Sequence, residues 1–145
     1  MKFRNEVSAG GIVFKKVQEK ILWLIVQHSQ HKGWVFPKGL IGDKKENEPM
    51  EEAALREVGE EGGVKAKIIV KLSKPVSYMY RFKDMLIRKT VYYFLMEYIS
   101  GDPKNHDWEV SDAKFLREEE IQKTLSFKSD KEAFEQALNL FLQKK

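Results

Sequence analysis

Acidic side chains cluster along one predicted helix at a spacing that places them together. A helix beginning at Pro49, with about 100° between successive residues, carries an apolar stripe made of Met50, Ala53 and Ala54 and flanked by Val58. Continued at the same spacing, the stripe reaches Glu57 and then Glu61, where the pattern demands apolar residues. Glu60 lies one turn beyond Glu57, on the edge of the stripe. We therefore expect three carboxylates on one face of this helix, pointing inward or into a cleft.

A bound divalent cation is the chemistry that this pattern favours. Carboxylates crowded in a buried place repel one another, and burial disfavours their ionisation. Mg²⁺ prefers a few carboxylate oxygens together with water and substrate phosphate oxygens. Arg56 lies one turn from Glu60 and from Glu52, so it can orient a carboxylate. The alternative is a solvated helix face with ordinary ion pairs. We expect that for Glu46, Glu51 and Glu52, whereas for the three inner acids the residues alone leave both interpretations open.

Strands and a loop are predicted before this helix. The strands cover Ser8 to Phe14, Ile21 to Val26 and, as a short strand ending at Pro37, part of Gly33 to Gly39. From Gly39 to Glu48 the chain is rich in glycine and charge, which predicts a loop. Pro49 suits the first turn of the helix, and Gly62 with Gly63 is a strong signal for its end.

Strands and a closing helix are predicted after it. Two long strands cover Ile68 to Val76 and Leu86 to Tyr98, with a polar turn around Lys83 and Asp84. In the second strand one face carries Val91, Tyr93 and Leu95 and the other Tyr92, Phe94 and Met96, so both faces are apolar and the strand lies inside a layered structure. A last strand covers Val110 to Leu116.

The closing helix opens at Ser129, which has capping-box spacing to Glu132. Its apolar stripe is Phe134, Ala137, Leu138 and Phe141. We expect the core to include Trp23, Trp108 and the phenylalanines, and His28 and His31 to be surface loop residues. These elements predict one domain of the α/β (α+β) class over residues 1–145.

Composition limits the class of protein. The 145 residues are 42% hydrophobic and 33% charged, an ordinary balance for a folded soluble domain. No apolar run approaches the length of a bilayer-spanning helix, and the first residues lack the apolar stretch of a signal peptide. There are no cysteines, which excludes disulfides and suits the cytoplasm, our expected location. The net charge of +4 favours polyanionic ligands only weakly.

A signature motif carries the strongest functional indication. Gly42, five residues, Glu48, seven residues and then Arg56-Glu57-Val58-Gly59-Glu60-Glu61-Gly62-Gly63-Val64 match nine specified positions over 23 residues. This arrangement resembles the Nudix box. Two further stretches, Ser8 to Phe14 and Trp34 to Gly39, resemble the first strand and the lead-in of that family. The resemblance covers nearly the whole chain and implies the Nudix fold, a mixed β-sheet sandwiched between α-helices.

The resemblance also implies roles for the acids. Glu57, Glu60 and Glu61 are expected to bind Mg²⁺, for which Mn²⁺ can substitute, while Glu48 and Arg56 brace the loop and hold Glu57. A metal-activated water would attack a phosphorus atom of the substrate. Glu57 or Glu61 could accept the proton of that water, or Glu109, since some relatives use a base from a late loop.

One departure from the family pattern concerns the glycine before the helix. Relatives with Pro-Lys-Gly usually begin the box at that glycine, here Gly39, yet eight residues separate it from Glu48 instead of five. The literal match begins at Gly42, so this loop is three residues longer. The metal ligand expected from a backbone carbonyl is therefore Gly39 or Gly42.

For the substrate, the lead-in and the downstream tyrosines resemble diadenosine polyphosphate hydrolases. Tyr78 and Tyr80 could stack on adenine, although plain sheet packing explains them equally well. The cations that could meet the extra phosphates are Lys38, Arg81, Arg88 and Lys89. We expect a small-molecule nucleotide partner, no membrane, no stable nucleic-acid binding, and a monomer or homodimer.

Other functions stay open. The substrate could be a damaged nucleoside triphosphate, an RNA 5′ end, ADP-ribose or a diphosphoinositol. A non-catalytic domain that senses a nucleotide is a second class, although such domains commonly lose box acids and none is lost here. A basic RNA-binding module is a third, without the aromatic strand or glycine loop that would support it.

Overall fold

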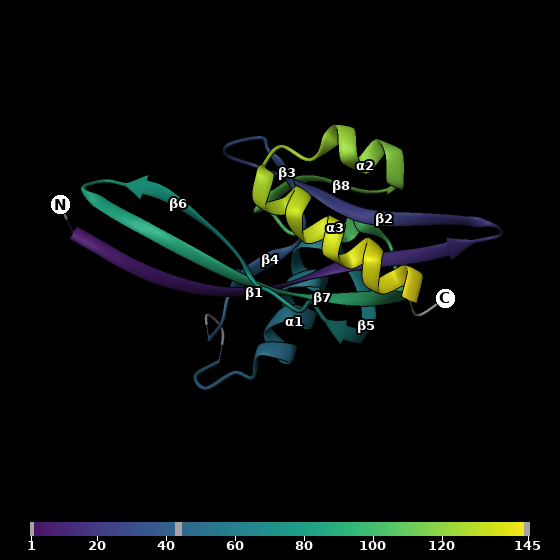
Figure 1. Cartoon of the computed structure of the whole chain (residues 1–145), viewed down its shortest axis with the longest axis horizontal. Helices are drawn as coiled ribbons and strands as arrows, with labels where there is room; N and C mark the ends of the chain where they lie inside the picture. The colour runs from purple at the N-terminus through teal and green to yellow at the C-terminus, as the bar shows by residue number, and fades with distance from the viewer. Residues whose placement is uncertain (1, 43–44, 144–145) are drawn as a thin grey trace.

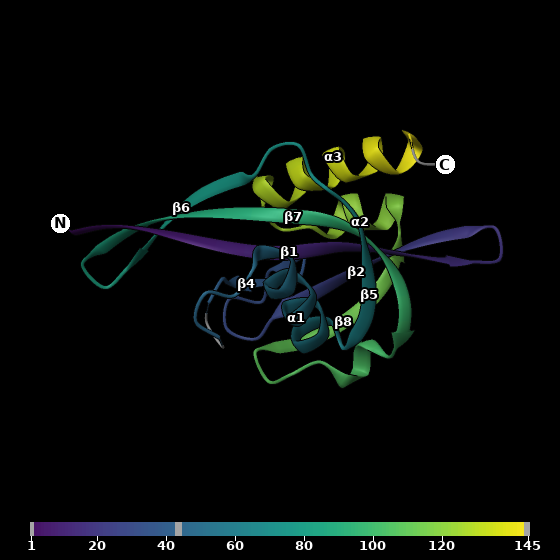
Figure 2. The same ribbon diagram turned by 90° about the horizontal axis from the view of Figure 1, so that it is seen from below.

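Helices cover both faces of one mixed β-sheet (Figure 2). A computed structural model of the chain describes residues 2–42 and 45–143. Helix α1 (Met50–Gly62) packs on one face, and α2 (Glu118–Thr124) with α3 (Lys128–Gln143) packs on the other. The α+β sandwich expected from the sequence is confirmed.

Two long parallel strands form the centre of the sheet. β1 (Lys2–Val17) pairs with β7 (Met85–Gly101) from Lys2 to Phe14, and β2 (Lys20–His28) follows β1 as an antiparallel hairpin. The remaining strands pair antiparallel with one of these three: β3 (Trp34–Val35), β4 (Lys38–Leu40), β5 (Val64–Lys71), β6 (Val76–Phe82) and β8 (Val110–Arg117). Away from the helices, β1, β6 and β7 extend together as an arm (Figure 1).

The alternation of side chains along β1 and β7 separates two cores. Toward α2 and α3 the buried residues include Ile12, Phe14, Trp23, Tyr93, Leu95 and Phe134. Toward α1 they include Ala9, Val13, Leu24, Phe94, Met96 and Val58. The two predicted apolar faces of β7 are therefore confirmed, because each face packs against a different helix layer.

Several predicted boundaries are wrong. The strand expected over Ile68 to Val76 is divided into β5 and β6, because Pro75 has no backbone N–H for a ladder bond and lies in the connection between them. Gly39 and Leu40, expected at the start of a loop, belong to β4, which pairs with β1. The rest of the longer loop includes residues 43–44, which lie outside the described residues.

The helix ends also differ slightly from expectation. Pro49 precedes the first turn of α1 and accepts the Ala53 N–H through its carbonyl, whereas Gly63, at φ +71°, ends the helix as predicted. Helix α3 begins at Lys128, so Ser129 lies inside its first turn and is not the cap. Helix α2 and a short 3₁₀ turn, η1 (Pro103–Asn105), were not predicted, because both are too short for a periodic pattern.

The expected core is correct for Trp23 and wrong for Trp108, which is 81% exposed. Trp108 lies in the loop before β8, where no strand or helix packs over it. Phe3, Phe82 and Phe127 are also exposed and Phe115 is half-buried, whereas the other five phenylalanines are buried. Across residues 2–42 and 45–143, no helix combines the length and apolar character that crossing a membrane requires.

Candidate functional site

Helix α1 is pressed directly onto the sheet, and this sets the direction of its acids. A side chain at Gly11 of β1 would place its Cβ 2.6 Å from Cγ2 of Val58, so glycine is required at this crossing. The apolar stripe of α1 thereby lies flat on β1. Glu57 and Glu61 continue that stripe past the crossing and are buried. The helical spacing in the sequence thus predicted the inward positions of Glu57 and Glu61, whereas Glu60, which was expected beside them, is only half-buried.

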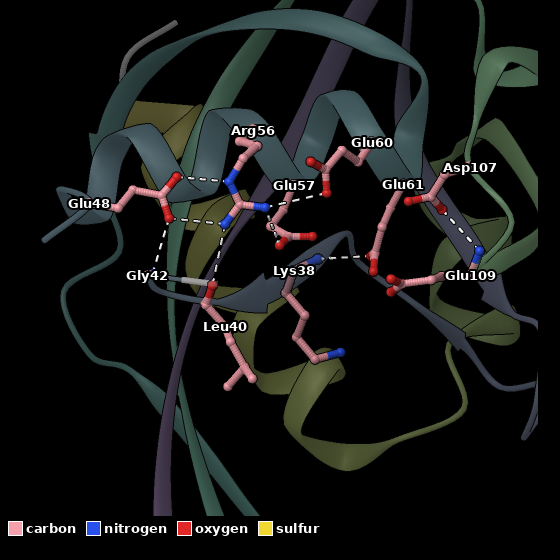
Figure 3. A network of polar contacts seen from close by, with 10 residues as sticks. All are labelled: Lys38, Leu40, Gly42, Glu48, Arg56, Glu57, Glu60, Glu61, Asp107 and Glu109. Atoms are coloured by element: carbon pink, nitrogen blue, oxygen red, sulfur yellow. Dashed lines mark hydrogen bonds and ion pairs between the residues drawn. The ribbon is translucent and has the colours of Figure 1, made fainter. Parts of the chain in front are cut away.

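The backbone of β4 lies against the two buried carboxylates. Any Cβ at Gly39 would overlap the Glu57 carboxylate, so only glycine fits there. The Lys38 N–H donates to Oε1 of Glu61 at 3.1 Å (Figure 3). Gly42 lies farther along, where its N–H donates to Glu48 at 3.1 Å. Of the two glycines that the sequence left open, Gly39 is the one that lies against an inner acid of α1, Glu57.

Arg56 braces the loop, the helix and one of the acids (Figure 3). Its Nε and Nη2 donate to the two carboxylate oxygens of Glu48 at 2.8 and 3.0 Å, a bidentate pair. Its Nη1 donates to Glu57 at 2.8 Å and to Glu60 at 3.3 Å. Nη2 also donates to the Leu40 carbonyl of β4 at 3.3 Å. One guanidinium therefore fixes Glu57 relative to both neighbouring segments.

The electrostatics differ sharply between the bracing acid and the inner acids. The Arg56 guanidinium lowers the pKa of Glu48, which is ionised and paired. Burial raises the pKa of Glu57 to about 7, although Arg56 opposes this. Burial raises the pKa of Glu61 to about 8, because only the Lys38 N–H and the Lys38 charge oppose it. The inner carboxylates thus lack the positive charge that full ionisation requires.

These carboxylates fit a magnesium-type site that is completed by substrate and water. In residues 2–42 and 45–143, no group of three or more His, Cys, Asp or Glu side chains is placed so that it could hold a metal ion by itself. Mg²⁺ commonly takes one or two protein carboxylates and completes its shell with water and phosphate oxygens. Buried oxygen donors with raised pKa values, such as Glu57 and Glu61, match that need.

A loop before β8 brings further acids to the same side. The Asp107 N–H donates to the Glu60 carbonyl at 2.8 Å, and the Glu109 N–H donates to Asp107 at 3.1 Å. The charge of Glu109 contributes to the raised pKa of Glu57, and that of Asp107 contributes to the raised pKa of Glu61. The expected late-loop acid, Glu109, therefore lies within electrostatic reach of the inner acids. Asp107, which no sequence motif indicated, lies there too.

A cavity of about 690 Å³ lies on the opposite side of Lys38, between β6 and the start of α3. Its lining includes His31, Lys38, Tyr78, Tyr80, Phe127 and Asp130. Lys38 connects the two places, since its N–H binds Glu61 and its Nζ lies 6.0 Å from the centre of the Tyr78 ring. Lys38 therefore lies between the cavity and the acids of α1.

A family model described as the NUDIX domain matches residues 4–137. The chain belongs to the Nudix family. Among curated proteins, the putative mutator protein MutT4 of Mycobacterium tuberculosis (strain CDC 1551 / Oshkosh) is 26% identical over 143 residues. That match covers 94% of this Nudix chain and 56% of MutT4, so the chain spans little more than half of that relative.

Solved structures share the Nudix fold at low sequence identity. A C. elegans Ap4A hydrolase binary complex has a TM-score of 0.68 and 21% identity, covering 97% of this chain and 99% of that one. The NUDIX domain of Shewanella oneidensis NrtR complexed with ADP ribose has a TM-score of 0.73 and 21% identity, covering 94% and 88%. NrtR complexed with a 27mer DNA has a TM-score of 0.69 and 23% identity, covering 95% and 63%.

The substrate residues predicted from this Nudix sequence do not all meet. Tyr78 and Tyr80 share one face of β6, with ring centres 6.2 Å apart, and Lys89 pairs with Tyr78 across the sheet. Arg81 and Arg88 are exposed and occupy alternate positions, which places them on the opposite face. We expected Arg81 and Arg88 to meet the same substrate as the tyrosines, and this expectation needs correction. Strand alternation places residues that are adjacent in sequence on opposite faces of the sheet.

Contacts within the arm hold part of this face. Glu6 of β1 accepts the Tyr80 hydroxyl at 2.9 Å and lies 3.6 Å from the Lys89 ammonium. Burial lowers the pKa of Lys89, and Glu6 opposes that effect. Nearby, the rings of His28 and His31 stack with centres 4.1 Å apart; His31 is exposed, as predicted, whereas His28 is half-buried at the end of β2.

Proposed function

We propose that this chain is a divalent-metal-dependent pyrophosphohydrolase that cleaves nucleoside diphosphate derivatives. The observation that carries the proposal is the pair of buried carboxylates, Glu57 and Glu61, on the inner face of α1 with raised pKa values. The expected ligands of Mg²⁺, or of Mn²⁺ in its place, are Glu57, Glu60, Glu61 and the backbone carbonyl of Gly39. Retention of every acid of the Nudix box supports catalysis over a role in nucleotide sensing alone.

The residues of the chain divide the work of positioning. Arg56 holds Glu57 in one orientation through a 2.8 Å hydrogen bond, and the paired Glu48 keeps Arg56 in place. The Lys38 N–H fixes Glu61, while the Lys38 side chain points toward the cavity. A bound Mg²⁺ or Mn²⁺ supplies positive charge to the diphosphate oxygens and lowers the pKa of a coordinated water.

A carboxylate of this site accepts the proton of the attacking water. A general base works best with a pKa near the operating pH. Glu57, with a pKa of about 7, and Glu61, with a pKa of about 8, both meet that condition in the metal-free protein. Glu109 is the third candidate, since it approaches from the loop before β8.

For the substrate we propose diadenosine tetraphosphate, cut asymmetrically to ATP and AMP. The cavity of about 690 Å³ has the size of a nucleoside site, and Tyr78 and Tyr80 offer aromatic surface for a base. Lys38 lies between this cavity and the acids, where a phosphate chain would run. The fold shared with a C. elegans Ap4A hydrolase supports this choice, and the NrtR domain solved with ADP ribose makes ADP-ribose the main competitor.

The test is a substrate panel with Mg²⁺. It contains diadenosine tetraphosphate, ADP-ribose, an oxidised guanine triphosphate, a triphosphorylated RNA and a diphosphoinositol, with products separated by chromatography. Glu57→Gln should abolish turnover, whereas Glu51→Gln, on the exposed side of the same helix, should leave it unchanged. Turnover that persists in excess chelator or in Glu57→Gln would refute the metal mechanism. Preference for another substrate by tenfold or more would refute diadenosine tetraphosphate alone.

A further inference from the structure

The cavity beside the acids contains a buried charged group that hydrolysis does not use. Asp130 lies in the first turn of α3, on the cavity wall, and is only 3% exposed. A carboxylate is seldom buried in this way unless partners satisfy both of its oxygens. The hydrogen-bond partners of its two oxygens therefore indicate which chemical group a ligand in the cavity supplies.

The structure supplies partners for one oxygen of Asp130. The Phe36 N–H and the Tyr93 hydroxyl both donate to Oδ1, each at 3.3 Å. Among the residues that the structure describes, no donor is within hydrogen-bond distance of Oδ2. In that same part of the chain Ser8 Oγ is the sole unpartnered side-chain oxygen or nitrogen sealed from solvent. Oδ2 is consequently not sealed, and the space beside it is the cavity.

We propose that Asp130 selects the nucleobase, with Oδ2 accepting a hydrogen bond from the exocyclic amino group of a purine. In the substrate proposed above this group is the 6-amino group of adenine. The inference rests on the proposed function, because it assigns the cavity to the nucleoside part of the substrate.

The cavity walls suit a flat base held against this carboxylate. Tyr78 and Tyr80 line it from β6, and Phe127 lines it from the segment before α3. Helix α3 contacts β6, and the start of the helix lies beside that strand in Figure 2. A base between these aromatic side chains presents its edge to Asp130 at one end of the cavity. Its ribose and phosphates then lead toward Lys38, which borders the acids of α1.

The cavity selects for the amino group because a base without it leaves Oδ2 of Asp130 without a hydrogen-bond donor. When a base that lacks the amino group binds, it displaces water from the carboxylate and forms no hydrogen bond in its place. Sites built around a buried polar group reject such analogues strongly. We expect a loss of about tenfold or more in affinity when the amino group is removed from the ligand.

The first experiment uses the unaltered chain without metal, so that binding is separated from turnover. AMP and purine riboside 5′-monophosphate, which differs only in lacking the 6-amino group, are titrated at alkaline pH and followed by NMR. AMP should bind about tenfold more tightly. Equal affinities, or no AMP binding, would overturn the inference.

The second experiment replaces Oδ2, a hydrogen-bond acceptor, by a group that donates hydrogen bonds. In Asp130→Asn the amide oxygen can keep the Phe36 and Tyr93 bonds, which leaves the NH₂ group facing the cavity. The variant should lose the preference for AMP and favour IMP, whose 6-oxo group accepts a hydrogen bond. Glu135→Gln is the matched control, because Glu135 is exposed on the same helix and lies outside the lining of this cavity. It should keep the preference for AMP.

The outcomes separate this inference from the proposed function. Hydrolysis of nucleoside diphosphate derivatives without any preference for the amino group would overturn the role of Asp130 and leave the hydrolase intact. A preference for AMP without hydrolysis of any member of the panel would refute the hydrolase and support Asp130. If Asp130→Asn does not fold, the comparison of the two ligands with the unaltered chain still decides.

Discussion

Glu61→Gln should stabilise the metal-free protein while it removes the response to metal. Burial raises the pKa of Glu61 from its ordinary 4.5 to about 8. The folded state therefore prefers the protonated carboxyl, whereas the unfolded chain ionises at the ordinary pH. Below pH 4.5 the carboxyl is neutral in both states and costs nothing. As the pH rises toward 8, ionisation of this carboxyl stabilises the unfolded state but not the folded state, so the free energy of unfolding falls.

The size of the effect follows from that difference. At pH 7 the side chain of the unfolded chain is about 2.5 pH units above its pKa, whereas the folded side chain is still below its own pKa. This difference is worth up to about 3 kcal/mol of unfolding free energy. Above pH 8 the penalty levels off at up to about 5 kcal/mol. Gln has no charge to lose, and its oxygen can still accept the Lys38 N–H. In chelator at pH 7, the variant should melt higher by up to about 10 °C.

Thermal unfolding in chelator and in saturating Mg²⁺, at several pH values, measures this directly. Mg²⁺ should raise the melting temperature of the unaltered protein and have little effect on Glu61→Gln. The stabilisation in chelator should disappear near pH 4.5. Glu51→Gln serves as the control, because Glu51 is exposed on the same helix. A variant that is less stable than the unaltered chain in chelator at pH 7 to 8 would refute the assignment of Glu61 as a buried carboxyl that lacks positive charge.

Three further results are expected. Gly39→Ala should reduce kcat by about a hundredfold or more, because its Cβ displaces the Glu57 carboxylate. Gly42→Ala, at φ +82° and without a close contact for the added Cβ, should cost about 1 kcal/mol of stability and little activity. Equal kinetic losses in steady-state assays would contradict this. Tyr80→Ala should raise KM about tenfold with little change in kcat. Tyr80→Phe, which loses only the hydrogen bond to Glu6, should keep a KM near that of the unaltered protein. A large increase of KM in Tyr80→Phe would show that the hydroxyl, and not the ring, binds the substrate. Activity should rise from pH 6 to 8 as the inner acids ionise and bind metal. A pH–rate profile with its optimum near pH 5 would contradict a base whose pKa is raised to about 7 or 8.

The acids of α1 were predictable because they break a local pattern. A charged residue at a position where helical spacing calls for an apolar one is visible in the sequence, and Glu57 and Glu61 are both buried there. Which of Gly39 and Gly42 lies against an inner acid was not predictable. It depends on the path of β4, which pairs with β1 far away in the sequence.

The base-selecting end of the cavity was hidden for a similar reason. Phe36 and Tyr93 are 94 and 37 residues from Asp130, so no local pattern connects them. An acid in the first turn of a helix ordinarily indicates a favourable interaction with the helix dipole at the surface. The separation of Arg81 from Tyr80, in contrast, follows from strand alternation alone and needed no structure.

The parallel pairing of β1 with β7 has a consequence for how the protein is made. Ser8 pairs with Val91, which follows it by 83 residues, and Ile12 pairs with Leu95. At a synthesis rate of about 5–20 residues per second, the first strand waits roughly 4–17 s for its partner. Its partners made before β7 are β2, opposite Phe14 to Val17, and β4, opposite Ser8 to Gly10. Until the ribosome has delivered β7, the apolar segment around Ile12 and Val13 is an open strand edge on a nascent chain, and a chaperone is its natural temporary partner.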